Sequence, residues 1–196
     1  PVGVWFADGT GKILYGNPAG QRIWSGALLV GPDEFHEYKA WWADSGKPLL
    51  SEDWAVARAV RTGETSLNEV LVIQCFDGSK KTILNSAVPF FSPLGDLYGV
   101  VVLNEDITER KAAEEAMHES EKRYRALFNE MSEGFALHEI VLDERGEPVD
   151  YRFLEVNPAF ERATGLRAPG IVGKTVSEVL PGTEPFWIRT FGEVAL

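Results

Sequence analysis

The stretch Asp106-Ile107-Thr108-Glu109-Arg110-Lys111 marks the point where the pattern of this sequence changes. Residues 97–103, just before it, are mostly apolar and rich in valine, as expected of a strand. After it, charged residues and alanines continue to about residue 131, and Asp106 and Glu109 have the spacing of a helix capping box. The stretch therefore predicts a strand that passes almost directly into a long helix over residues 107–131.

Two further β-rich runs, residues 69–76 and 82–88, come before this strand. The turn sequence Asp77-Gly78 separates them, and Pro93-Leu94-Gly95 precedes the run 97–103. Short β-rich runs joined by such turns predict an antiparallel three-stranded meander.

Residues 51–63, ahead of the meander, have the signals of a helix. Ser51 stands in the N-cap position, acidic residues fill the first turn, arginines fill the last, and Gly63 stands in the C-cap position. We therefore expect a helix over this segment.

The sequence also contains an internal repeat. Residues 16–22 align with residues 156–162, with Asn, Pro, Ala and Arg identical, and Gly3-Val4-Trp5 aligns with Gly134-Phe135-Ala136 upstream. In both copies the Asn can accept hydrogen bonds from the free amides of a helix start, and the Pro suits the first helical position. Each copy therefore predicts the order strand, turn, strand, helix.

Taken together, these features resemble a PAS domain, and the stretch 106–111 is similar to the segment that joins PAS sensor cores to the next helix in bacterial signalling proteins. The resemblance implies an α+β fold, with a PAS-like five-stranded antiparallel sheet, short helices on one face, a linker helix and a partial second PAS module. It divides the chain into a PAS module over 1–106, a connecting signalling helix over 107–131, and the N-terminal part of a second, truncated PAS module over 132–196. Because the second copy lacks the three meander strands, we expect it to be loosely ordered or to complete itself against another chain or the first module, and the chain to be a piece of a longer protein.

Composition argues against several classes of protein. The 196 residues include 19 Lys+Arg and 30 Asp+Glu, a formal net charge of −11, which disfavours nucleic-acid binding. No apolar run approaches the ~20 residues that span a bilayer, so we expect no membrane contact within this fragment. Cys75 is the only cysteine, and we interpret it as a buried structural thiol. The resemblance and the lack of disulfides predict a cytoplasmic location and leave open a membrane-associated parent protein.

No enzyme is predicted within these residues. His118 is followed by Glu119-Ser120-Glu121, which is not the pattern of a phosphorylated histidine in a sensor kinase, and Gly9-Thr10-Gly11-Lys12 is a hairpin turn rather than a phosphate-binding loop. The resemblance implies a sensory or regulatory input module of a signal-transduction protein. The expected parent is a sensor histidine kinase of a two-component system.

The resemblance also implies a small-molecule pocket between the inner face of the sheet and the short helices. Asn85 is the expected inward-facing polar group, because it alternates with Ile83 and Ala87. The alternative is that the aromatic residues simply fill a core without a ligand. We favour no cofactor; haem bound through His36 is the alternative, although the acidic surroundings of His36 indicate an exposed turn. The expected ligand-binding residues are Trp24, Phe35, Trp41, Trp54 and Asn85, and no metal site is expected.

Signal relay is expected to run through the helix that follows Asp106, with Asp106, Thr108 and Glu109 as the relay residues. Along this helix, a weak apolar seam at heptad positions 113, 117, 120, 124, 127 and 131 predicts a homodimer. The alternative for the helix is a plain solvated connector. The alternative function for the chain is a ligand-free dimerisation or spacer module.

Overall fold

The computed structural model describes residues 2–195 and divides into two compact units, the first ending at Glu115 and the second beginning at Ala116. Each unit has a hydrophobic core of its own. The long helix α3 (Thr108–Glu130) contains the boundary and contributes residues to both units. Within residues 2–195, no helix combines the length and the apolar character needed to cross a membrane.

The first unit is built on a six-stranded antiparallel sheet with the strand order β2-β1-β6-β5-β4-β3. Its first and last strands pair side by side in the interior of the sheet, which joins the N-terminal hairpin to the meander. The α+β fold class expected from the sequence is confirmed. The strands are β1 (Val2–Asp8), β2 (Ile13–Gly16), β3 (Lys39–Trp42), β4 (Ser66–Gln74), β5 (Lys80–Phe91) and β6 (Leu97–Asp106).

The edge strand β3 is an addition to the five strands expected from the sequence. It pairs with β4, with Ala40 opposite Ile73 and Trp41 opposite Val72. Because β3 has only four residues and loop-rich sequence on both sides, its pattern is too short to show strand periodicity.

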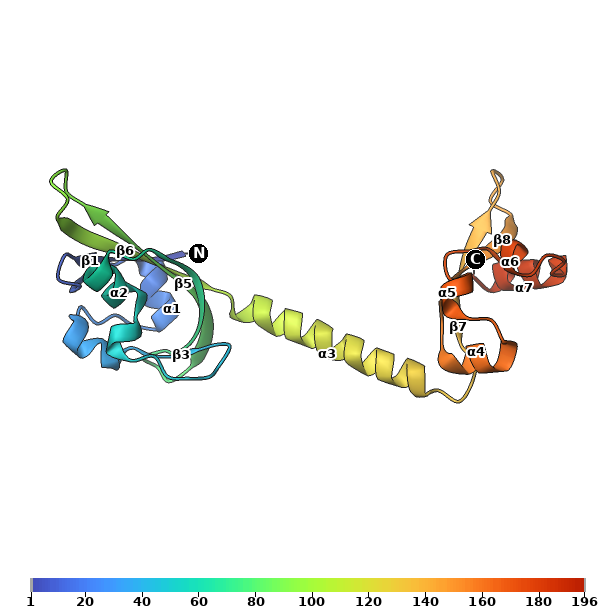
Figure 1. Cartoon of the computed structure of the whole chain (residues 1–196), viewed down its shortest axis with the longest axis horizontal. Coiled ribbons are helices and arrows are strands. Elements are labelled where there is room, and N and C mark those ends of the chain that lie inside the picture. The colour runs from blue at the N-terminus through green and yellow to red at the C-terminus, as the bar shows by residue number, and fades with distance from the viewer. Residues whose placement is uncertain (1, 196) are drawn as a thin grey trace. The chain divides into compact units, whose positions relative to one another are not determined.

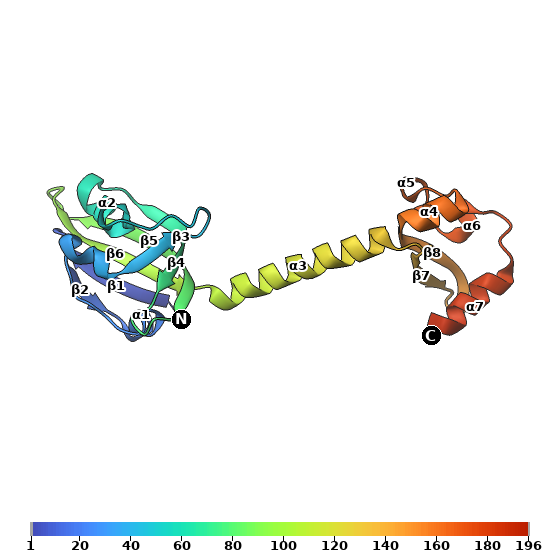
Figure 2. The ribbon, with the colours of Figure 1, turned by 90° about the horizontal axis from the view of Figure 1, so that it is seen from below.

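Short helices cover one face of this sheet: α1 (Pro18–Trp24), α2 (Ala55–Thr62) and the 3-10 turns η1 (Pro32–Glu37) and η2 (Ser51–Asp53) (Figures 1 and 2). The core of the unit lies between these helices and the inner face of the sheet. Cys75 is buried there, and its thiol donates to the carbonyl of Ile23 at 3.2 Å, which confirms a structural thiol.

The predicted helix over 51–63 is divided in two, and Ser51 is not its N-cap. Trp54 has an extended backbone (φ −57°, ψ 135°) that separates η2 from α2, and its indole is buried in the core. Burial of a large aromatic ring therefore outweighs helix continuity at this position. The C-terminal prediction is confirmed, since Gly63 adopts the left-handed conformation at the C-cap.

Both Asn-Pro sequences begin helices in the predicted way. Asn17 Oδ1 accepts from the amides of Gly20 (2.7 Å) and Val4 (3.0 Å). In the second copy, Asn157 Oδ1 accepts from the amides of Phe160 (2.8 Å) and Phe135 (2.9 Å). The two copies thus use Asn in the same way, to cap a helix and to accept from an amide in, or just before, the first strand of the hairpin.

The second unit pairs β7 (Ala136–Leu142) with β8 (Pro148–Val156) in a two-stranded sheet. Four helices follow: α4 (Pro158–Thr164), α5 (Ala168–Ile171), α6 (Val176–Val179) and α7 (Pro185–Ala195). Tyr151, Phe153 and Val156 of β8 bury their side chains with Ile171 and Val176 of the helices. The hairpin and its own helices therefore form a small core.

We expect His138 to make the stability of the second unit sensitive to pH. Its ring lies 4.6 Å from that of Tyr151 and 4.8 Å from that of Phe153, and burial lowers the pKa of His138 from its ordinary value of 6.5. Because the unfolded chain then binds the proton more readily, we expect the melting temperature of this unit to fall as pH drops below about 6.5. His138→Phe should remove this dependence; an unchanged pH profile in His138→Phe would contradict the assignment.

Candidate functional site

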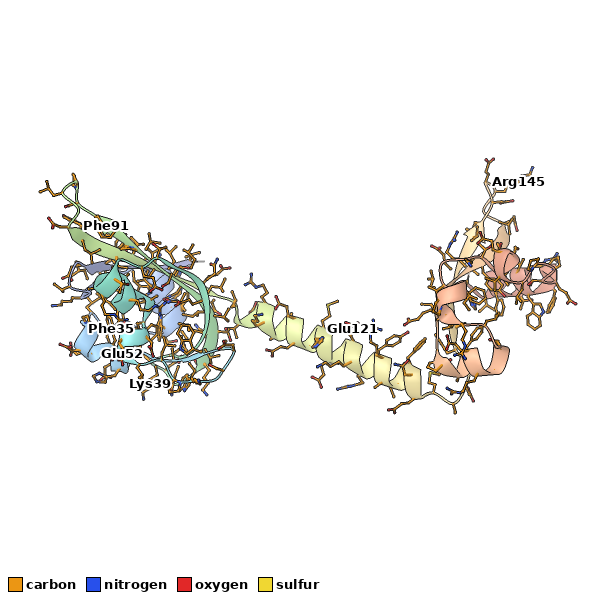
Figure 3. All side chains as sticks on the ribbon, in the orientation of Figure 1. Phe35, Lys39, Glu52, Phe91, Glu121 and Arg145 are labelled. Carbon is orange, nitrogen blue, oxygen red and sulfur yellow. The ribbon has the colours of Figure 1, made fainter. Side chains whose placement is uncertain are left out.

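A small cavity lies between the inner face of the sheet and the helices of the first unit. Its volume is about 50 Å³, and a cavity needs roughly 10–15 Å³, measured in the same way, to hold one water molecule. Its lining carries no charged side chain. Phe35, from η1, lies on the helical side (Figure 3). The aromatic and amide residues of the lining are Trp5, Trp24, Phe35, Tyr38, Trp54, Asn85 and Asn104.

Trp5 enters this lining because two glycines leave room for its ring. A Cβ atom at Gly16 would lie 2.2 Å from the ring, and one at Gly20 would lie 2.9 Å from it. Any larger residue at these positions would displace the indole, so the sequence of the second strand and first helix sets the position of a cavity wall.

A buried amide network connects this wall to the sheet. Asn104 Oδ1 accepts from the indole Nε1 of Trp5 (2.9 Å) and of Trp24 (3.0 Å). Asn104 Nδ2 donates to Asn85 Oδ1 (2.9 Å) and to the carbonyl of Leu103 (3.0 Å). Asn85 and Asn104 stand directly opposite each other on β5 and β6, which brings the two amides together.

The network fixes the orientation of both amides. An indole N–H can only donate, so the atom of Asn104 that faces Trp5 and Trp24 must be its oxygen. Its nitrogen must then face Asn85, whose oxygen accepts, and this leaves the Asn85 nitrogen as a free donor. The orientations of both side chains therefore follow from hydrogen-bond chemistry.

Two buried donors of the lining have no hydrogen-bond partner among residues 2–195: Nδ2 of Asn85 and Nε1 of Trp54. Asn85 is 2% exposed and Trp54 is 7% exposed. The hydroxyl of Tyr38, by contrast, is fully used, since it donates to the carbonyl of Leu28 (2.8 Å) and accepts from its amide (2.9 Å). Burial raises the pKa of Tyr38, which keeps this hydroxyl protonated.

Comparison with protein families gives two matches. A family model described as PAS fold matches residues 1–112, more than half of the chain, and another described as PAS domain matches residues 122–195. This chain belongs to the PAS family. PAS domains are sensory modules of signalling proteins, and two matches give a tandem arrangement. A comparison with curated proteins found no match.

Solved structures similar to this PAS chain include a sensory box histidine kinase/response regulator from Burkholderia thailandensis E264 (18% identity, TM-score 0.41, covering 64% of this chain and 92% of that one). Another is the PAS domain of nitrogen regulation protein NR(II) from Vibrio parahaemolyticus (14% identity, TM-score 0.38, 54% and 89%). The PAS domain of the fruit-fly ELK potassium channel is also similar (10% identity, TM-score 0.42, 54% and 86%).

The structure brings together most of the residues that the sequence suggested for a ligand site. Trp24, Phe35, Trp54 and Asn85 all line the cavity of the PAS module. Trp41 does not: it is half-buried on the edge strand β3, with the ammonium of Lys80 5.1 Å from its ring. Its position on the sheet edge, rather than on a helix, keeps it out of the cavity.

Among the aromatic and amide residues of the lining, three were not expected from the sequence: Trp5, Tyr38 and Asn104. Asn104 had a readable signal, because it continues the inward alternation of Val100 and Val102 on an apolar strand. Trp5 and Tyr38 had none, since their positions depend on the glycines beside Trp5 and on the loop at Leu28.

Haem does not fit this cavity. The side chain of His36 is 65% exposed, and its Nδ1 lies 3.1 Å from the carbonyl of Asp33 within η1. His36 is absent from the cavity lining, and a volume of about 50 Å³ is far too small for a porphyrin. Among residues 2–195 there is also no cluster of three or more His, Cys, Asp or Glu that could hold a metal ion.

The start of α3 is bonded to the strand that carries Asn85. The carbonyl of Thr82 on β5 accepts from the amide of Ile107 (2.9 Å), and the amide of Thr82 donates to Thr108 Oγ1 (3.0 Å). Asp106 Oδ1 accepts from the amide (3.0 Å) and the hydroxyl (2.6 Å) of Thr108. The expected capping box with Glu109 is not formed; Asp106 instead closes a turn onto Thr108, because the helix begins two residues after it.

Proposed function

We propose that the first PAS module is a sensory input domain in which the state of the cavity is relayed through β5 to α3. The observation that carries this proposal is the double connection of Thr82 to the start of α3, three residues along β5 from Asn85 in the cavity wall. A shift of β5 would therefore move both hydrogen bonds at the junction. Two sites joined by one element are what an allosteric relay requires.

The same junction is the proposed boundary between the first functional unit of the chain and the helix that follows it. We propose a PAS module over 1–106, a signalling helix over 107–131 and a second, partial PAS module over 132–196. The proposed parent is a cytoplasmic or membrane-associated sensor histidine kinase, with the fragment itself serving as a regulatory and not a catalytic part. Asp106 and Thr108 are the proposed relay residues, since they make the contacts to each other and to Thr82.

Asp106→Ala should uncouple the relay without unfolding the module. The change removes the acceptor of both Thr108 bonds, which costs about 1 kcal/mol, as the loss of a helix cap does. We expect the melting temperature to fall by only a few degrees, while the output of the intact parent protein becomes insensitive to its signal. Circular dichroism and an output assay measure the two effects.

Glu109→Gln is the matched control for this test. Glu109 stands on the same turn, and within residues 2–195 its side chain makes no hydrogen bond to another residue. The control should leave signalling unchanged. A parent protein that still responds normally with Asp106→Ala would contradict the relay.

The alternative function is a ligand-free dimerisation or spacer module, and exposed apolar residues on α3 favour it. Met117 is 76% exposed and Leu127 is 64% exposed, both on the predicted seam.

If α3 forms the dimer seam, sedimentation of the purified chain should show a homodimer. Met117→Glu should weaken that dimer at least about tenfold, since a charge would replace a buried apolar contact. His118→Glu, one position off the seam, is the control and should leave the dimer intact. A dimer that persists in Met117→Glu, or a monomeric wild type, would reject the seam.

A further inference from the structure

The two unpartnered donors of the cavity indicate which ligand it takes. We propose that the cavity binds a small, neutral molecule whose carbonyl-type oxygen accepts hydrogen bonds from Nδ2 of Asn85 and Nε1 of Trp54. This inference rests on the proposed sensory function, because it names the ligand class of the same cavity.

The ligand must bring an acceptor because both free groups can only donate. The indole of Trp54 has no acceptor atom. The amide of Asn85 cannot be turned over, since its oxygen is held by Asn104, and Asn104 is held in turn by Trp5 and Trp24. Buried N–H groups are normally paired, so a ligand without an acceptor would leave a large part of the available binding energy unused.

The ligand must be neutral because the lining offers no opposite charge. Aromatic and aliphatic side chains surround the two donors, and the cavity lining has no Lys, Arg or His. A carboxylate would lose its hydration on entry without an ion-pair partner, which is strongly unfavourable. The hydroxyl of Tyr38 is already engaged with Leu28 and provides no further donor.

The ligand must also be small. A volume of about 50 Å³ lies far below the roughly 300–1,000 Å³ of sites for drug-sized molecules. The aromatic walls suit short alkyl groups on either side of the oxygen. A short-chain ketone or aldehyde combines this size with a single acceptor that has two lone pairs.

Three probes of the same shape test the proposal: acetone, acetate and 2-methylpropene. They carry, respectively, a neutral acceptor, a charged acceptor and no acceptor. Binding is followed in the full chain by the nuclear magnetic resonance signal of the Trp54 indole N–H, which Trp54→Phe identifies. We expect acetone to shift this signal, with a dissociation constant of about a millimolar for so small a molecule. Acetate and 2-methylpropene should bind at least about tenfold more weakly.

Variants separate the donors from general packing. Trp54→Phe and Asn85→Ala should each weaken acetone binding about tenfold, followed in the first case by the indole signal of Trp24. Trp24→Phe is the matched control, because it removes an indole of the same wall whose N–H already bonds Asn104. It should weaken binding clearly less than Trp54→Phe does. Equal losses of acetone affinity in Trp54→Phe and Trp24→Phe would overturn the role of the free donors. If Trp54→Phe does not fold, the affinity of Asn85→Ala is compared with that of Trp24→Phe instead.

Two other results would overturn the ligand class. If 2-methylpropene binds as tightly as acetone, the cavity is an apolar site; if none of the three shifts the Trp54 signal, water alone satisfies the donors. The indole signal reports binding whether or not α3 responds. Acetone binding with an unaltered α3 would therefore reject the relay and keep the ligand class. If acetone does not bind but Asp106→Ala still uncouples signalling, the ligand class is rejected and the relay is kept.

Discussion

Asn104→Ala is expected to lower the free energy of unfolding of the first PAS module by about 4 kcal/mol, because it leaves two buried indole donors unpaired at roughly 1–3 kcal/mol each. Those donors belong to Trp5 and Trp24, and both bond the one oxygen that the change removes. The Asn85 oxygen loses its partner as well. Urea denaturation followed by tryptophan fluorescence measures the loss.

Asn85→Ala is the control for this prediction. It removes one bond of the network, and Asn104 Nδ2 still has the carbonyl of Leu103 as an acceptor. We expect a loss of about 1 kcal/mol, the typical net contribution of one hydrogen bond. Similar losses for Asn104→Ala and Asn85→Ala would show that the indole bonds do not hold the network together.

Arg58→Met should destabilise the same module by about 3 kcal/mol, in the range seen when one partner of a buried ion pair is removed. The guanidinium of Arg58 pairs with Glu69 and with Glu64, and it also bonds Ser66 Oγ (2.7 Å) and the carbonyl of Asp53. The side chains of Arg58 and Glu69 are 15% and 18% exposed, so the remaining Glu69 carboxylate would be poorly solvated. The cluster ties α2 to β4.

The double variant Arg58→Met/Glu69→Met tests this explanation by the same denaturation measurement. Removing both charges should recover part of the loss, because the penalty in Arg58→Met comes mainly from an unpaired carboxylate. If the loss in the double variant equals the sum of the losses in Arg58→Met and Glu69→Met, the two side chains do not interact.

The parts of the fold that the sequence predicted are those set by local signals. The Asn-Pro helix starts, Gly63 at the C-cap and the meander turns each depend on the conformational preferences of a few neighbouring residues. The division of residues 51–63 was not predictable in this way, because the break at Trp54 arises from burying its indole among residues distant in sequence. The strand β3 was missed because its four residues are too few to show strand periodicity.

The candidate site was predictable only in part for a related reason. Strand alternation places Asn85 inside the sheet, and the same alternation would have found Asn104. Which donors stay free depends on how Trp5, Trp24 and the two amides share hydrogen bonds. These partners lie far apart in the sequence, so only the three-dimensional structure shows which of them meet. The predicted capping box between Asp106 and Glu109 was wrong, because the Asp106 carboxylate accepts from Thr108 instead.

The most direct test of the account is one nuclear magnetic resonance titration of the full chain with acetone, read at two places. The Trp54 indole reports the cavity, and the amides of Thr82 and Ile107 report the junction with α3. The account predicts that all three signals move with the same dissociation constant in the wild type, and that the Ile107 response is lost in Asp106→Ala while the indole response remains. An indole signal that moves while Thr82 and Ile107 stay fixed in the wild type would contradict it.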